Sequence, residues 1–160
     1  MSRPCLLLLT AVLAVGAARV ATASPSAPAA APSHCAEVKV DPSDTSIYVG
    51  SVSLSIRPLT RSNGVYRSDY TAKVFPYFFF SEHGTISIDV SDDLLRRIER
   101  GEAVDFTGHA NNSEGKERRI EGQAVPAAAG ADHGKMKVRV WVGKHLELVF
   151  NTVYRFTGKE

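Results

Sequence analysis

Residues Tyr48 to Val74, YVGSVSLSIRPLTRSNGVYRSDYTAKV, indicate a β fold because apolar and polar side chains alternate along them with a period of two. One face carries Tyr48, Gly50, Val52, Leu54 and Ile56, and later Tyr66, Tyr70, Ala72 and Val74. The other face carries Ser51, Ser53 and Ser55, and later Arg67, Asp69, Thr71 and Lys73. Such alternation predicts two half-buried strands joined as an antiparallel hairpin.

The connection Ser62-Asn63-Gly64 sets the register of this hairpin. A three-residue loop, closed by Gly64 in the left-handed conformation, pairs Arg61 with Val65 and sets Ile56 opposite Tyr70. A two-residue Asn-Gly turn slips the register by one residue and moves Ile56 to a polar neighbour. We therefore predict the three-residue loop, which lets the two apolar faces coincide.

Similar glycine-containing loops recur along the chain and predict further hairpins. They are Glu82-His83-Gly84, which pairs Phe80 with Ile86; Ser113-Glu114-Gly115, which pairs Phe106 with Gly122; and Gly143-Lys144-His145, which joins strands of inward-facing residues ending at Val142 and starting at Leu146.

One helix is predicted at about residues 92–100, with Ser91 as its N-cap, Asp92 and Asp93 in its first turn and Gly101 after its last. An apolar edge formed by Leu94, Leu95 and Ile98 can cover a sheet or plug a barrel end. The pattern as a whole predicts a mostly β fold. We expect a single small antiparallel barrel or two-layer sandwich of about 7–8 strands with this one short helix.

The N-terminus predicts export. Residues 1–23 combine an early arginine, an apolar run and a small-residue ending at Ala23, as in a cleaved signal peptide. Residues 24–34 are rich in serine, proline and alanine and predict a disordered linker, followed by a single β domain at residues 35–160. We expect a periplasmic or extracellular protein with no transmembrane segment after cleavage.

The net charge and the cysteine content limit the classes of partner and the disulfides that the sequence allows. Arg3 and Arg19 account for the net charge of +2, so the rest of the chain is neutral, which argues against nucleic acid as a partner. Only Cys35 remains after cleavage, so an internal disulfide cannot form. We expect Cys35 to be an unstructured thiol at the domain edge or the point of an intermolecular disulfide.

No arrangement of residues in the sequence indicates catalysis or a cofactor. The histidines at 34, 83, 109, 133 and 145 lack the spacing of a zinc site. His34 precedes Cys35, but we expect this pair at the disordered edge of the domain, and the serines alternate on a solvated strand face. We predict no catalytic residues, no metal and no cofactor. An enzyme stays open as an alternative, if acidic side chains converge in the fold.

The segment from Val74 to Phe80, VFPYFFF, abandons the alternation because it is apolar on both faces. Phe78 and Phe80 are expected in the core, which leaves Phe75, Tyr77 and Phe79 on the opposite face. Either the apolar edge of the helix covers these three rings, or they form a binding face for an apolar ligand or a protein partner.

A second candidate patch lies on one face of the strand before the last loop. Lys135, Lys137, Arg139 and Trp141 form a basic stripe with an aromatic end, which can bind an anionic polymer or glycan. The alternative is an ordinary solvated strand exterior, with Glu147 opposite Trp141.

Three segments of the sequence resemble segments of other proteins: GEAVDFTGHA at residues 101–110, RRIEG at 118–122 and FNTVYRF at 150–156. In these the chain resembles an uncharacterised group of small secreted bacterial β-domain proteins with no known activity. The resemblance implies export and a β fold, and it carries over no functional residue.

Together these patterns favour an exported, non-enzymatic binding or interaction module of the cell envelope that uses its aromatic face. The alternatives are a small β-barrel enzyme with polar residues converging at a barrel mouth and a structural envelope component that self-associates.

Overall fold

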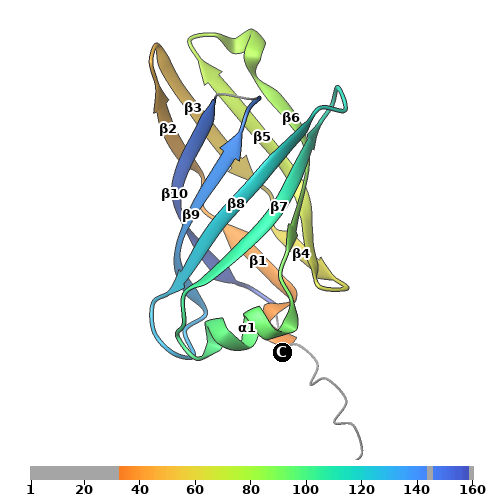
Figure 1. Ribbon diagram of the computed structural model, residues 1–160, viewed down its shortest axis with the longest axis vertical. Coiled ribbons are helices and arrows are strands. Elements are labelled where there is room, and N and C mark those ends of the chain that lie inside the picture. Colours follow the sequence, from red (N-terminus) through yellow and green to blue (C-terminus); the bar gives the residue numbers. More distant parts are fainter. Residues whose placement is uncertain (1–32, 144–145, 159–160) are drawn as a thin grey trace, which may run out of the picture.

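The alternating segments form antiparallel strands in the computed structural model, which describes residues 33–143 and 146–158 (Figure 1). The strands are β1 (Glu37–Val40), β2 (Ser43–Ile47), β3 (Gly50–Ile56), β4 (Leu59–Ser62), β5 (Val65–Phe75), β6 (Glu82–Asp89), β7 (Val104–Asn112), β8 (Glu117–Pro126), β9 (His133–Trp141) and β10 (Glu147–Phe156). Short 3₁₀ helices η1 (Ser33–Ala36) and η2 (Phe78–Phe80) and the helix α1 (Asp92–Glu99) complete them. The predicted signal peptide and nearly all of the predicted linker lie outside the described residues.

Eight strands close into a barrel, in the order β5-β4-β1-β10-β9-β8-β7-β6 and back to β5. Strands β3 and β2 are two additional members that extend the wall beside the upper part of β5 (Figure 1). The closed ring of pairings selects the barrel over the sandwich. No helix among the described residues is long and apolar enough to cross a bilayer.

The first hairpin has the predicted strand register but not the predicted turn. Ile56 pairs with Tyr70, as expected. The turn nevertheless contains only Asn63 and Gly64, both with positive φ, and it pairs Ser62 with Val65. This is the tight Asn-Gly turn that matches the twist of two strands, and the three-residue loop was the wrong prediction.

A β-bulge reconciles the short turn with the register. Arg57 bonds to Asp69 through its backbone and Thr60 pairs with Arg67, so Pro58 and Leu59 together oppose the single residue Ser68. Proline has no amide hydrogen to lose, which suits a bulge. The bulge divides the expected long strand into β3 and β4, and it turns β4 towards β1.

Two of the other predicted hairpins are confirmed. Phe106 pairs with Gly122 across β7 and β8, and its ring occupies the space that a side chain at Gly122 would need. Leu148 pairs with Val140 across β9 and β10, in the predicted register, although Lys144 and His145 of that loop lie outside the described residues. Leu146, expected inward, is exposed.

The hairpin predicted at Glu82-His83-Gly84 is wrong. These residues belong to β6, where Gly84 pairs with Tyr70 of β5. Strand β5 ends at Phe75 because Pro76 cannot donate to a ladder, and η2 follows within the connection. The rings of Phe78–Phe80 are therefore exposed rather than part of the core, and so is Tyr48, which lies in the β2–β3 turn.

Helix α1 closes the lower end of the barrel (Figure 1). Its N-cap is Ser91, as predicted, with the side-chain oxygen accepting a hydrogen bond from the amide of Leu94. Leu95 and Ile98 are buried in the core, and Arg61 of β4 pairs with Asp92 at 2.6 Å. The helix thus lies at the end opposite the aromatic segment, so the interpretation that it covers those rings is wrong.

Cys35 belongs to the core at this lower end, with 1% of its surface exposed. Burial first, and then the charge of Glu99, raises the pKa of the thiol to about 11, against a smaller opposing effect of Arg61. The expectation of an unstructured thiol is wrong. An intermolecular disulfide requires Cys35 to leave the core.

Candidate binding site at the barrel mouth

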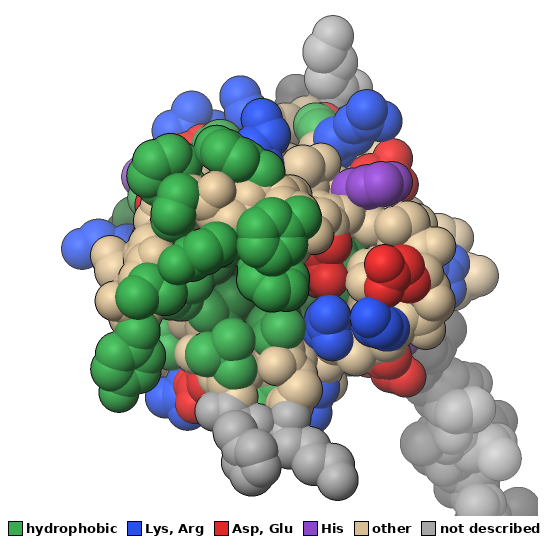
Figure 2. Space-filling view, turned by 90° about the horizontal axis from the view of Figure 1, so that it is seen from above, with side chains coloured by type: hydrophobic (Ala, Val, Ile, Leu, Met, Phe, Trp, Pro, Cys, Tyr) green, Lys and Arg blue, Asp and Glu red, His purple; other side chains and the backbone are tan. Residues whose placement is uncertain are grey.

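Large apolar side chains remain exposed at the upper end of the barrel, which we call the mouth. They come from three separate segments: Tyr48 and Val49 of the β2–β3 turn, Phe75 and Tyr77–Phe80 at the β5–β6 connection, and Leu146 before β10. Figure 2 looks down on the mouth and shows apolar side chains around a hollow on one side, with charged side chains at its opposite edge. The mouth is therefore amphipathic.

The hollow is a funnel with a volume of about 640 Å³. Its apolar wall includes Ile47, Val49, Val74, Tyr77, Phe79, Phe80 and Leu146. Its polar wall consists of Ser81, Glu82, Asn112, Glu114, Lys116 and Arg118. We call this space the mouth funnel.

The barrel interior below the mouth funnel is filled by side chains. Two small apolar cavities there measure about 50 and 60 Å³, the larger beside α1. Either holds little more than one or two water molecules. Of the cavities described, the mouth funnel is the one whose apolar wall can accept a larger molecule.

The aromatic rings of the mouth divide into two groups. Tyr77, Phe79 and Phe80 line the mouth funnel, with ring centroids 4.5 to 6.4 Å apart, and we call them the inner group. Phe75 and Phe78 make an edge-to-face contact at 5.8 Å and, like Tyr48, do not line the funnel. We call Tyr48, Phe75 and Phe78 the outer group.

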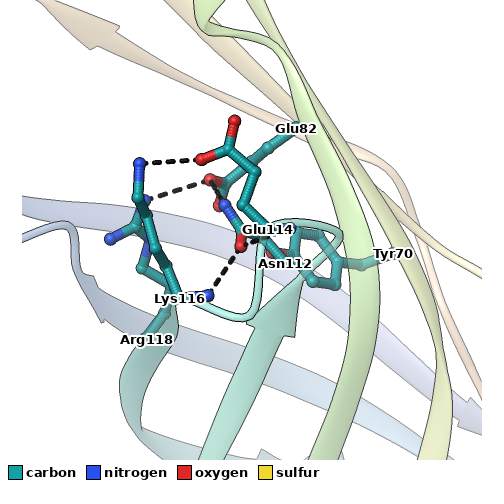
Figure 3. Close-up of polar contacts among 6 residues, drawn as sticks. All are labelled: Tyr70, Glu82, Asn112, Glu114, Lys116 and Arg118. Carbon is teal, nitrogen blue, oxygen red and sulfur yellow. Dashed lines mark hydrogen bonds and ion pairs between the residues drawn. The ribbon is translucent and has the colours of Figure 1, made fainter.

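The polar wall is centred on the carboxylate of Glu82 (Figure 3). It accepts hydrogen bonds from the Tyr70 hydroxyl at 3.1 Å, the Asn112 side-chain amide at 3.2 Å and the Arg118 guanidinium at 3.1 Å. These four side chains come from β5, β6, β7 and β8, so the network joins four neighbouring strands. It fixes a carboxylate and a guanidinium at the base of the funnel, across from the apolar wall.

Asn112 also shapes the rim. Its side-chain oxygen accepts hydrogen bonds from the amides of Glu114 and Lys116, which holds the β7–β8 turn. On that turn the Lys116 ammonium pairs with the Glu114 carboxylate at 2.7 Å (Figure 3). The rim therefore carries a second, exposed ion pair above the first.

The contacts of Glu82 determine its charge. Burial by itself raises the pKa of this carboxyl, but the hydrogen bond and charge of Arg118, with the bonds from Asn112 and Tyr70, lower the pKa overall. Burial and the neighbouring Glu82 carboxylate raise the pKa of the Tyr70 hydroxyl. Glu82 thus stays ionised with both oxygens engaged, which makes it a weak general base.

The predicted site residues separate into two places. Phe75, Tyr77 and Phe79 are exposed at the mouth, where Tyr77 and Phe79 line the funnel and Phe75 does not. Lys137 and Arg139 lie on the outer wall of β9, where Arg139 approaches Glu147 at 3.5 Å. Trp141 lies there too, opposite Glu147 as expected, with the Arg119 guanidinium 5.3 Å from its ring centroid. The basic stripe is separate from the funnel.

Sequence reasoning missed Glu82 and Arg118, although a signal was present. Glu82 lies four residues before the buried Ile86, and Arg118 lies two residues before the buried Ile120. Because side chains an even number of residues apart share one face of a strand, both charged residues lie on the inward face. Opposite charges on the inward faces of two β-strands indicate a pair inside the barrel. The incorrect prediction of a loop at residues 82–84 took Glu82 out of a strand, so its inward position was not recognised.

Among the described residues, no group of three or more His, Cys, Asp or Glu side chains is placed to hold a metal ion. No family model, curated protein or solved structure matches the chain. The molecule is a small β-barrel with an exposed aromatic cluster at its mouth.

Proposed function

We propose that the protein is an exported, non-enzymatic binding module whose mouth funnel takes the apolar part of an amphipathic small molecule. The observation that carries this proposal is the inner group: three aromatic rings on the wall of an open funnel of about 640 Å³. Export rests on the signal-peptide pattern of residues 1–23.

The size and the lining of the mouth funnel support a small-molecule ligand. Pockets for such ligands measure about 300–1,000 Å³ and combine apolar walls with a few fixed polar groups. Exposed aromatic rings lose contact with water when a ligand covers them, and they lose little conformational entropy because each ring has few rotatable bonds.

The polar wall supports an amphipathic rather than a purely apolar ligand. Glu82 and Arg118 stand at the base of the funnel and Lys116 at its rim, so a polar head can keep hydrogen bonds while an alkyl chain lies against the inner group. The Arg118 side chain keeps 16% of its surface exposed at the base of the funnel, so its charge can face the polar head of a ligand.

A titration with a dansyl-labelled C11 fatty acid tests the proposal. We expect saturable dansyl fluorescence with the wild-type protein and a loss of affinity of about tenfold in Phe79→Ser, since one phenyl ring of apolar contact is removed. Phe78→Ser is the matched control because Phe78 is an equally exposed neighbour that does not line the funnel.

Two outcomes refute the proposal. Binding that is absent in the wild type, or that falls by the same factor in Phe78→Ser and Phe79→Ser, excludes the mouth funnel as the site. Circular dichroism of both variants verifies that the barrel is intact.

A further inference from the structure

We propose that the outer group docks the barrel mouth onto the surface of a lipid bilayer. This inference goes beyond the proposed function because Tyr48, Phe75 and Phe78 do not line the mouth funnel. A ligand inside the funnel leaves these three rings in water, with Phe75 at 59% and Phe78 at 68% exposure. Their exposure needs a different partner.

The outer group is built from two segments that the fold holds together. Strand β3 pairs with β5 so that Ser51 lies opposite Phe75, and the backbone of Gly50 lies so close to the Phe75 carbonyl that no side chain fits between them. Tyr48 precedes Gly50 in the β2–β3 turn, and Phe78 contacts Phe75. The β2–β3 turn and the β5–β6 connection, which carry these rings, both lie at the upper end of the barrel beside the paired strands β3 and β5 (Figure 1).

Charge along these tips fits a membrane surface. Segments 45–52 and 74–81, which carry the rings, contain no aspartate or glutamate. The exposed Asp44 lies lower, in the same row of the sheet as Lys73, where it accepts a hydrogen bond from Ser53. Lys73 is exposed on the same outer face of β5 as Phe75, two residues and therefore about 7 Å further down the strand. An aromatic tip above a lysine is the arrangement of an interfacial anchor, in which the ring enters the acyl boundary and the ammonium meets phosphate.

The depth of the apolar band also favours a bilayer. Below Lys73 the outer face of β5 continues with Thr71, Asp69 and Arg67, and Asp69 pairs with Arg57, which lies between β3 and β4. On this side of the barrel only the rim is apolar, to about 7 Å below Phe75, which matches the roughly 5–10 Å to which interfacial segments enter a membrane. The opposite side of the rim carries the exposed Glu114–Lys116 ion pair. The charged wall below stops deeper insertion.

Co-sedimentation with vesicles tests the inference, using purified protein with the same N-terminus in every variant. The vesicles are phosphatidylcholine alone, or phosphatidylcholine and phosphatidylglycerol at about 4:1. We expect the wild type to bind both and the anionic vesicles more tightly, because of Lys73. Phe75→Ser and Phe78→Ser each lower the partition coefficient by about tenfold. Val125→Ser, which removes an exposed apolar side chain elsewhere on the barrel, leaves it unchanged.

Three outcomes overturn the inference: no vesicle binding by the wild type, an equal loss in Val125→Ser, or a self-association that Phe75→Ser abolishes without any vesicle binding. The test also separates this inference from the proposed function. Phe75→Ser retains affinity for the dansyl fatty acid in the absence of vesicles. A protein that binds vesicles through the outer group but takes no fatty acid supports docking and refutes only the funnel as a binding site.

Discussion

Replacing Glu82 with glutamine tests how the polar wall is held. The substitution keeps the shape of the side chain but removes the charge that faces Arg118, and the two side chains are only 22% and 16% exposed. Breaking one side of a buried ion pair costs about 3–5 kcal/mol, and partial exposure places this pair at the lower end. We therefore expect Glu82→Gln to lower the free energy of unfolding by about 3 kcal/mol, or Tm by about 10 °C.

The effect of Glu82→Gln depends on pH in a direction that follows from its pKa. The folded protein holds the pKa of Glu82 below the ordinary value of 4.5, so the stabilisation is fully present above that value. It is lost as the pH falls through the folded pKa. The difference in unfolding free energy between wild type and Glu82→Gln is expected to be largest at neutral pH and to shrink in acid.

Urea denaturation of the two proteins at pH 7 and in steps towards acid measures this difference. Glu114→Gln is the matched control, since Glu114 also pairs with a cation but lies exposed on the rim. We expect its midpoint to equal that of the wild type. A Glu82→Gln variant as stable as Glu114→Gln, or a difference that does not change with pH, refutes the structural role assigned to the network.

Three further predictions concern the lower end of the barrel. Ser91→Ala removes the N-cap of α1 and should lower the unfolding free energy by about 1 kcal/mol in urea denaturation. Leu95→Ala opens a cavity under α1 and should cost about 3 kcal/mol in the same assay, whereas equal stability would contradict the plug. Cys35 should react with dithionitrobenzoate at pH 8 about 100-fold more slowly in the folded protein than in urea, because the thiol is buried and its pKa is raised.

The alternation of polar and apolar residues predicted the strands, whereas the bulge that compensates for the shorter turn could not be predicted. The register of Ile56 with Tyr70 was correct although the turn used to derive it was not, because a bulge at Pro58 and Leu59 absorbs the extra residue. The position of the bulge depends on the strands that pair on either side of it: β3 pairs with β2, whereas β4 pairs with β1. Periodicity within one segment does not contain that information.

The aromatic segment shows a second limit. Apolar residues on both faces predicted a strand with one side in the core, but η2 turns Phe78 and Phe80 out at the mouth. Hydrophobicity alone cannot distinguish a ring that is buried in the core from one that stays exposed at the surface. The pairing of Glu82 with Arg118, by contrast, could have been inferred because each lies on the same face of its strand as a buried isoleucine.

NMR chemical-shift mapping with dodecanoic acid below its critical micelle concentration shows whether a ligand binds in the mouth funnel. We predict saturable shifts for side chains of the mouth funnel, such as Val74, Phe79 and Leu148, with no change at Val104 beside α1. Shifts centred on Trp141 at the outer wall of β9, or no saturable shifts at all, would contradict a ligand site in the mouth funnel.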